Sequence, residues 1–353
     1  MTYELNEKLK NIVPYDPVAG DYRIRLDANE SFIDPGEMFG EELQAAISRL
    51  KFNRYPDSMA TDLCRKFAQY YGVDPACVVA GNGSDELITV IMGAFLRPGD
   101  KVLTFSQEFS MYRFYGEIYE KKNIVAEKKD DLILTSGDVL NAVDDCDPAA
   151  VIISNPCSPT SLVMSREDVL HIVENTDALV VIDEAYMDFS DQSIMKVAEK
   201  YDNLIVLKTC SKAWGMAAIR LGFAVSSRRI VQALHSIRSP YNVNALTQAA
   251  GCVIFSKPEY IKKAVEDIKK ARDYLYQGLL RLEGAEGVRR VIKPDTNFVY
   301  VEMEDSEFVY EELKNRSIIV RRLGDYLRIT AGTKKENDAL LQALSEILQE
   351  VSP

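Results

Sequence analysis

The sequence has 353 residues, of which 47% are hydrophobic and 27% charged, a balance typical of a soluble globular protein with about two domains. Acidic residues outnumber basic ones by 54 to 42, so the formal net charge is -12. Such a chain repels phosphate backbones and acidic lipid surfaces, which argues against nucleic-acid and membrane partners. Its longest apolar runs have the length of strands and not of membrane-spanning helices. The first eleven residues lack the apolar stretch of a signal peptide, so we expect a cytoplasmic protein.

The side chains available for catalysis are restricted. Six cysteines are scattered without close pairs or zinc-type spacing, so we expect reduced thiols and no metal site. Only two histidines, His171 and His235, could serve a catalytic triad or an imidazole metal site. The chemistry must therefore depend on lysine, aspartate, tyrosine or arginine, or on a cofactor.

Between residues 78 and 225, short apolar runs alternate with helical patterns. A helix is predicted after Ser84, and another after Ser165, whose spacing to Asp168 is typical of a capping box. The alternation indicates a mainly parallel sheet flanked by helices, the α/β class. We expect its strands at residues 78–80, 101–105, 151–154, 179–182, 204–207 and 222–225.

The last hundred residues predict a second, smaller unit of the α+β class. A long amphipathic helix is expected at 259–283 with Gly284 at its end, followed by strands at 297–301, 318–320 and 326–329 and by a closing helix. We therefore divide the chain into a large domain, 31–245, and a small domain made of 1–30 together with 246–353. The two domains are expected to share a cleft.

Polar side chains follow several of the predicted strands, where α/β sheets bind ligands. A Gly-rich turn at 81–84 could hold an anion, although alone a tight connection is at least as good an interpretation. A nicotinamide dinucleotide site is an alternative suggested only by this turn, which lacks the third glycine of that motif. Asp183 and Lys212 each follow a strand, and Arg220 lies eight positions after Lys212. A lone Lys212 would be a solvated loop residue. In combination these residues are the parts needed to hold pyridoxal phosphate.

Nine short stretches, spread in order over nearly the whole chain, carry a resemblance to a known family. Through them the chain resembles the class I and II aminotransferases, pyridoxal-phosphate enzymes of fold type I, and among them most closely the histidinol-phosphate aminotransferases. The resemblance implies amino transfer between histidinol phosphate and 2-oxoglutarate in histidine biosynthesis, by a homodimer with shared active sites. The stretches are residues 26–30, 54–57, 83–86, 109–112, 155–156, 183–186, 211–213, 220–222 and 327–330.

The same resemblance implies a role for individual residues. Lys212 would bind the cofactor and move a proton, Asp183 would pair with the ring nitrogen, and Tyr112 would stack on the ring. Asn155 and Tyr186 would hydrogen-bond the phenolate oxygen. The remaining implied contacts are Gly83, Ser84, Asp85, Thr209, Ser211 and Arg220 around the phosphate, Tyr55 reaching it from the partner subunit, Arg328 on the substrate carboxylate, and Tyr15, Asn29 and Arg321 as further substrate contacts.

Two departures leave other functions open. The family pattern Asn-Pro-Asn-Asn-Pro-Thr-Gly is replaced at 155–161 by Asn-Pro-Cys-Ser-Pro-Thr-Ser, and Gly-Leu-Ala-Gly-Leu-Arg is replaced at 215–220 by Gly-Met-Ala-Ala-Ile-Arg. An L-threonine-O-3-phosphate decarboxylase or a broader aromatic or 2-oxo-acid aminotransferase would share the scaffold. A catalytically silent ligand sensor with this fold is the alternative of a different class. The basic pairs at 121–122, 128–129 and 289–290 are expected to be solvated.

Overall fold

A computed structural model describes residues 3–10, 12, 18–284 and 287–351. Its largest element is a sheet of seven strands in the order β2-β8-β7-β6-β5-β3-β4. All neighbours pair in parallel except β8, which runs antiparallel to both β2 and β7. The strands are β2 (Val78–Gly81), β3 (Lys101–Phe105), β4 (Lys122–Ala126), β5 (Ala150–Ser154), β6 (Leu179–Asp183), β7 (Leu204–Thr209) and β8 (Gly222–Ser226).

The six strands predicted in this region are confirmed, and so is the predicted mainly parallel sheet. Only β4 escaped prediction, because it is an edge strand whose residues are partly exposed and whose apolar run is short. Side chains alternate between the two faces of the sheet: Val180 and Ile182 pack into one apolar cluster, whereas Val181 packs into the other. Both faces are therefore covered, as a parallel sheet requires.

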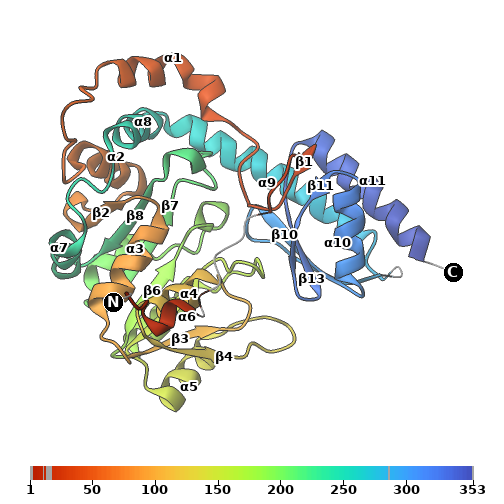
Figure 1. Ribbon diagram of the computed structural model, residues 1–353, viewed down its shortest axis with the longest axis horizontal. Coiled ribbons are helices and arrows are strands. Elements are labelled where there is room, and N and C mark those ends of the chain that lie inside the picture. Colours follow the sequence, from red (N-terminus) through yellow and green to blue (C-terminus); the bar gives the residue numbers. More distant parts are fainter. Residues whose placement is uncertain (1–2, 11, 13–17, 285–286, 352–353) are drawn as a thin grey trace.

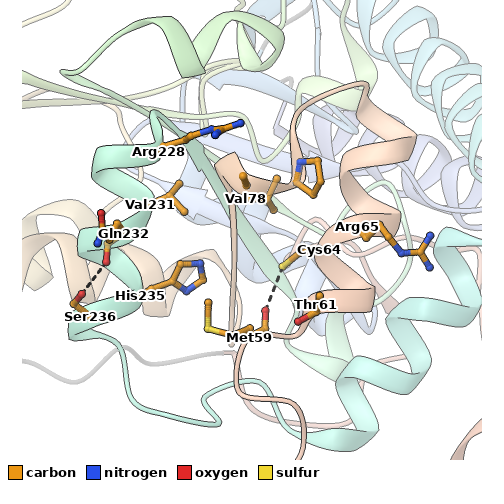
Figure 2. Close-up of a pocket in the computed structure, with 12 residues that line it drawn as sticks. Met59, Thr61, Cys64, Arg65, Val78, Arg228, Val231, Gln232, His235 and Ser236 are labelled. Atoms are coloured by element: carbon orange, nitrogen blue, oxygen red, sulfur yellow. Dashed lines mark hydrogen bonds between the residues drawn. The ribbon is translucent and has the colours of Figure 1, made fainter.

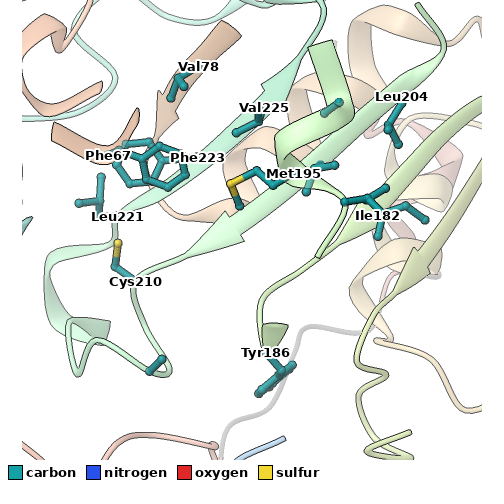
Figure 3. Close-up of a cluster of buried hydrophobic side chains, with 14 of the residues drawn as sticks. Phe67, Val78, Ile182, Tyr186, Met195, Leu204, Cys210, Leu221, Phe223 and Val225 are labelled. Carbon is teal, nitrogen blue, oxygen red and sulfur yellow. The ribbon is translucent and has the colours of Figure 1, made fainter. Parts of the chain in front are cut away.

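Helices cover the two faces of the large sheet (Figure 1). On one face, Phe67 of α2 (Thr61–Tyr71) stacks on Phe223 of β8 (Figure 3). The centroids of the two rings are 4.0 Å apart. The predicted cap of α6 is confirmed, since Ser165 accepts a hydrogen bond from the amide of Asp168. The helices of this part are α1 (Pro35–Ser48), α2 (Thr61–Tyr71), α3 (Ser84–Val90), α4 (Met111–Ile118), α5 (Ser136–Cys146), α6 (Arg166–Glu174), α7 (Arg228–Ile237) and α8 (Ala245–Phe255).

The small domain lies to one side and is joined by the long helix α9 (Pro258–Leu280), visible in Figure 1. Its main sheet is antiparallel, with strand order β12-β13-β10-β9. The elements are β9 (Val288–Ile292), β10 (Phe298–Met303), β12 (Arg321–Leu323), β13 (Tyr326–Thr330), α10 (Ser306–Asn315) and α11 (Lys334–Val351).

Chain segments from both ends meet in the small domain. The short strand β1 (Ile24–Arg25) pairs in parallel with β11 (Ile318–Ile319), so the segment that follows β1 is anchored to this domain. At the other boundary, α8 begins at residue 245 but packs on the large domain, because Ile254 and Phe255 belong to the apolar cluster of that domain. Ile268 of α9 belongs to the same cluster. The core of the large domain thus extends beyond the predicted boundary at 245.

Short 3-10 and π turns complete the described fold. They are Glu7–Lys10, Pro75–Cys77, Ile91–Phe95, Met187–Phe189, Met195–Lys200 and Ala217–Ile219. In the ranges described, no helix combines the length and the apolarity needed to cross a membrane.

Candidate active site

The direction of the strands brings the predicted site residues to one edge of the large sheet. Asp183 is the last residue of β6, and Thr209 is the last residue of the neighbouring parallel strand β7. Because β8 is antiparallel, its first residue, Gly222, lies at the same edge, in register with Gly81 of β2 and with Thr209. The segments around Ser84, Asp183, Lys212 and Arg220 therefore converge although they are far apart in sequence.

A cavity of about 610 Å³ opens at this edge. Segments of both domains form its wall, since Arg321 and Arg328 come from the small-domain sheet. Twelve of the predicted site residues line it: Asn29, Ser84, Asp85, Tyr112, Asp183, Tyr186, Thr209, Ser211, Lys212, Arg220, Arg321 and Arg328.

At one end of the cavity, the turn after β2 crosses directly over the start of β8. A Cβ on Gly222 would lie 2.3 Å from the backbone nitrogen of Ser84, so this close approach requires glycine. Arg220 contacts Asp85 through Nη2 at 3.2 Å and Ser211 Oγ through Nη1 at 3.4 Å. A guanidinium group, hydroxyls and a Gly-rich turn form a cluster suited to a phosphate group.

Asp183 is a buried carboxylate at the end of β6, and only 5% of it is exposed. Burial raises the pKa of Asp183 to about 6, while hydrogen bonds from Tyr112 and from the backbone amide of Ala185 act in the opposite direction. A cationic ring nitrogen placed against this carboxylate would favour its ionised form. The predicted partner of a pyridinium nitrogen therefore has the burial that such a pairing requires.

Tyr112 has a contact that the sequence did not indicate: its hydroxyl donates to Asp183 Oδ2 at 2.9 Å. The hydroxyl thus orients the carboxylate, whereas stacking of Tyr112 on the cofactor ring stays a prediction. Phe109 also lines the cavity, is less buried, and packs edge-to-face on Tyr112 with centroids 5.5 Å apart. It is a second aromatic residue available for stacking, and its place in the same 109–112 motif could have revealed it.

Lys212 and Tyr186 are both contacted by the segment that follows β1. Lys212 Nζ donates to the carbonyl oxygen of Ala28 at 2.8 Å, and Asn29 Nδ2 donates to the hydroxyl oxygen of Tyr186 at 2.8 Å. Asn29 is itself held by Thr330, whose hydroxyl donates to Asn29 Oδ1 at 3.1 Å. Asn29, predicted as a substrate contact, is thus a neighbour of Tyr186 in the wall of the cavity.

Asn155 has structural contacts that the sequence did not indicate. Its amide closes the 155–164 loop, because Nδ2 donates to the carbonyl of Met164 and Oδ1 accepts from the Met164 amide at 2.8 Å. Asn155 lines a separate cavity of about 170 Å³ and not the main one. Ser158, one of the departures from the family pattern, lines the main cavity instead. The contact of Asn155 with the phenolate oxygen of the cofactor stays a prediction.

Two arginines of the small domain face the cavity together. Arg321 on β12 and Arg328 on β13 are direct cross-strand partners. Arg328 Nη1 donates to Ser158 Oγ at 3.3 Å, and Nη2 donates to the carbonyl of Asp27 at 2.8 Å. Two guanidinium groups side by side suit a substrate with acidic groups, since arginine binds carboxylate and phosphate in a bidentate manner.

The expectation that the basic pairs are solvated is wrong for two lysines. Lys121 is buried and donates to the carbonyl of Leu96 at 2.9 Å. The side chain of Lys128 is 1% exposed and forms an ion pair with Glu108 at 3.1 Å in the wall beside the cavity. Lys128 Nζ also lies 3.2 Å from Cys157 Sγ. Burial raises the pKa of the Cys157 thiol. No sequence pattern singled out Glu108, because its partner is twenty residues away.

Three predicted site residues do not line the main cavity, and one lies outside the described residues. Gly83 belongs to the turn next to it, Asn155 faces the smaller cavity, and Tyr55 is 81% exposed elsewhere on the surface. Tyr15 falls in the part of the chain that is not described. A further cavity of about 630 Å³ lies between α2 and α7, and none of the predicted site residues lines it. Figure 2 shows the residues that line this cavity.

The residues at the main cavity fit pyridoxal phosphate. The phosphate cluster, the buried carboxylate of Asp183 and the amine of Lys212 meet in one space, and the glycines at 83 and 222 leave room where a Cβ would collide. Together with the mixed seven-stranded sheet and the smaller antiparallel one, they define an enzyme of fold type I that depends on pyridoxal phosphate.

Comparison with known proteins leads to the family. Residues 24–344 match the family model of class I and II aminotransferases. The chain is 37% identical over 348 residues to a histidinol-phosphate aminotransferase of Clostridium kluyveri, which covers 97% of this chain and 98% of the relative. A histidinol-phosphate aminotransferase of Clostridium novyi is 35% identical, with coverage of 98% and 97%. The chain therefore belongs to the class I and II aminotransferases, which confirms the predicted enzyme class and cofactor.

Solved structures share the fold. The histidinol-phosphate aminotransferase of Sinorhizobium meliloti in complex with pyridoxal-5'-phosphate superposes with a TM-score of 0.89 at 22% identity, over 100% of this chain and 99% of the other. An L-threonine-O-3-phosphate decarboxylase of Porphyromonas gingivalis reaches a TM-score of 0.80 at 19% identity, over 92% and 99%. Enzymes of different activity thus share this architecture, and the fold alone does not identify the substrate.

The raised pKa of Asp183 predicts how the cofactor-free protein responds to pH. Its folded pKa of about 6 lies above the ordinary value of 3.8, so its contribution to stability is present below pH 4 and is lost as pH rises through 6. We expect wild type to lose about 2–3 kcal/mol relative to Asp183→Asn between pH 4 and pH 7.5. Urea unfolding of both cofactor-free proteins measures this difference.

The control for this experiment is Asp191→Asn, which removes an exposed carboxylate. Its stability relative to wild type should not change over the same pH range. A difference between wild type and Asp183→Asn that is the same at both pH values would refute the raised pKa.

Proposed function

We propose that this chain is a histidinol-phosphate aminotransferase that transfers an amino group from histidinol phosphate to 2-oxoglutarate with pyridoxal phosphate as cofactor. The observation that carries the proposal is the meeting of Lys212, Asp183 and the cluster around Arg220 in one cavity. The substrate is inferred from the curated relatives, which are 35–37% identical over nearly their full length and bear that name.

Each of these cavity residues has a separate role in the proposed reaction. When bound, pyridoxal phosphate supplies an electron sink for the bond that breaks at the substrate Cα. Lys212 Nζ holds the cofactor and carries the proton removed from Cα, while the buried Asp183 carboxylate neutralises the ring nitrogen. The hydroxyl oxygen of Tyr186 accepts a hydrogen bond from Asn29. The hydroxyl proton of Tyr186 is therefore left to be donated to the phenolic oxygen of the cofactor. Arg220, Ser211 and the turn at 81–84 hold the phosphate.

The two arginines of the small domain suit the two substrates that such an enzyme must bind in turn. Arg328 contacts Ser158 of the large domain and Asp27 of the amino-terminal segment, so its guanidinium group is held at the cavity wall. We assign Arg328 to the α-carboxylate of glutamate or 2-oxoglutarate. Arg321, its cross-strand partner, lies where a second acidic group of a substrate would bind.

The proposed enzyme is a homodimer with shared active sites. Tyr55 is 81% exposed and stacks on Tyr241, which is itself exposed, with ring centroids 4.5 Å apart. Exposed apolar clusters of this kind mark protein interfaces. Tyr55 does not line the cavity of its own chain, so it is available to the cavity of a partner subunit.

We infer a cytoplasmic location from the chemistry of the chain. All six cysteines are free thiols, and four of them are buried with raised pKa values: Cys64, Cys77, Cys157 and Cys210. Reduced, unpaired cysteines are typical of proteins that work in a reducing compartment.

The purified protein should be yellow and should form glutamate from histidinol phosphate and 2-oxoglutarate. Lys212→Ala should abolish turnover, because it removes the amine that holds the cofactor and moves the proton. Borohydride should fix the cofactor to Lys212, as peptide mass spectrometry would show. Release of CO2 from threonine phosphate without glutamate formation would favour the decarboxylase, and a colourless protein would exclude both enzymes.

Arg328→Ala should raise the KM for glutamate at least about tenfold, because two charge-assisted hydrogen bonds to the carboxylate are lost. Steady-state kinetics measure this effect. Arg229→Ala, a change on the exposed side of α7, is the matched control and should leave KM unchanged. An unchanged KM for glutamate in Arg328→Ala would refute the role of Arg328.

In sedimentation velocity the protein should have a mass of about 79 kDa, twice the 39.7 kDa of one chain. Tyr55→Ala should weaken binding of pyridoxal phosphate about tenfold, since a hydrogen bond to the phosphate is lost. Tyr3→Ala removes a tyrosine that is 85% exposed and should have no effect. A monomer with full activity would contradict the shared site.

A further inference from the structure

We infer that Glu86, Asn242 and Arg238 are positioning residues that hold the phosphate-binding turn at 81–84 in shape. The inference deepens the proposed function, because it takes this turn and Arg220 as the place where the cofactor's phosphate binds. None of the three residues lines the main cavity, so they act through the turn and do not touch the cofactor.

Glu86 connects the turn to a segment that is distant in sequence. Its Oε2 accepts hydrogen bonds from the backbone amide of Asn82 and from Asn242 Nδ2, each at 2.7 Å. Asn242 Nδ2 also donates to the carbonyl of Ala80 at 3.3 Å. The side-chain amide of Asn242 is therefore bonded directly to the end of β2. It is bonded to the turn that follows β2 through Glu86.

Arg238 orients that amide group. Its Nη1 donates to Asn242 Oδ1 at 2.5 Å, so the NH2 group of Asn242 must face Glu86 and Ala80. The other guanidinium nitrogens contact the carbonyl of Ser58 and His235 Nδ1, and only 9% of the residue is exposed. Across the residues that the structure describes, no carboxylate lies within ion-pair distance of Arg238. The buried cation is linked to Glu86 through Asn242.

This arrangement meets an electrostatic requirement of the turn. Asp85 and Glu86 follow the turn directly, and both would repel a bound phosphate if they were left without partners. Asp85 pairs with Arg220 at 3.2 Å. The Glu86 carboxylate accepts hydrogen bonds from the amide of Asn82 and from Asn242 and does not line the cavity. It therefore supports the turn and does not compete with a bound phosphate.

The turn has little room to move without disturbing Arg220. Gly83 has a φ of 81°, and a Cβ at this position would lie 2.8 Å from Arg220 Nη2. The peptide groups of the turn therefore pack closely against the guanidinium group on one side. On the other side the hydrogen bond from Asn82 to Glu86 limits their rotation. Loss of this bond should disorder the phosphate contacts selectively.

The test compares two ligands, pyridoxal phosphate and pyridoxal, which lacks the phosphate. Cofactor-free protein is titrated with each, and the absorbance of the lysine-bound ligand gives the dissociation constant. Asn242→Ala should raise the constant for pyridoxal phosphate about tenfold, the effect of one lost hydrogen bond to a charged group. The constant for pyridoxal should change by less than about twofold, because the turn does not contact it.

Further variants separate positioning from general destabilisation. Glu86→Ala should match Asn242→Ala, and the double variant should bind little worse than either, since both changes break one network. Glu86→Gln keeps an acceptor oxygen and should restore most of the affinity. Asn175→Ala, at the exposed end of α6, is the matched control and should have no effect.

Equal weakening for both ligands, or unchanged binding of pyridoxal phosphate by Asn242→Ala, would overturn the inference. Failure of the wild-type protein to bind either ligand would contradict the proposed function instead.

Discussion

The burial of the Asp183 carboxylate is the constraint on which the rest of the site depends. A carboxylate at the end of a central strand loses its water, and its charged form becomes costly. The structure offsets this cost with the hydroxyl of Tyr112 and the amide of Ala185, yet the pKa remains raised to about 6. Only a cation inside the cavity would complete the balance. In the proposed function, the cationic ring nitrogen of the cofactor would supply the charge that this carboxylate needs.

The same reasoning applies to Glu108, a second buried acidic residue in the wall of the main cavity. Glu108 accepts hydrogen bonds from the hydroxyl and the amide of Ser154, and its charge is balanced by the buried ammonium group of Lys128. Removing one partner of such a pair leaves an uncompensated buried charge. Cys157 completes the cluster in a position where the family has asparagine. The departure at 157 is thus accommodated by a lysine that comes from the end of another strand.

Most of the large sheet could be predicted from the sequence, because buried strands are short apolar runs separated by turns. Lys212, Asp183 and Arg220 could be placed together, since parallel strands end at one edge. The two hydrogen bonds of Asn155 to Met164 could not be predicted, because they depend on the shape of a loop. The burial of Lys121 and Lys128 was missed for a related reason: a charge run has no periodicity that reveals a distant partner. Edge strands such as β4 and short strands such as β12 lack the apolar pattern of a core.

The pairing of β1 with β11 links the segment that follows β1 to the small domain. Because Ile24 pairs with Ile318, the segment from Asp27 to Asn29 is attached to the small domain, although it contacts residues of the large one. It accepts a hydrogen bond from Lys212, donates one to Tyr186, and accepts one from Arg328. A shift of the small domain would therefore move Arg328 and the neighbours of Lys212 and Tyr186 together. In the proposed function, substrate binding at Arg328 would in this way be mechanically linked to Lys212 and Tyr186.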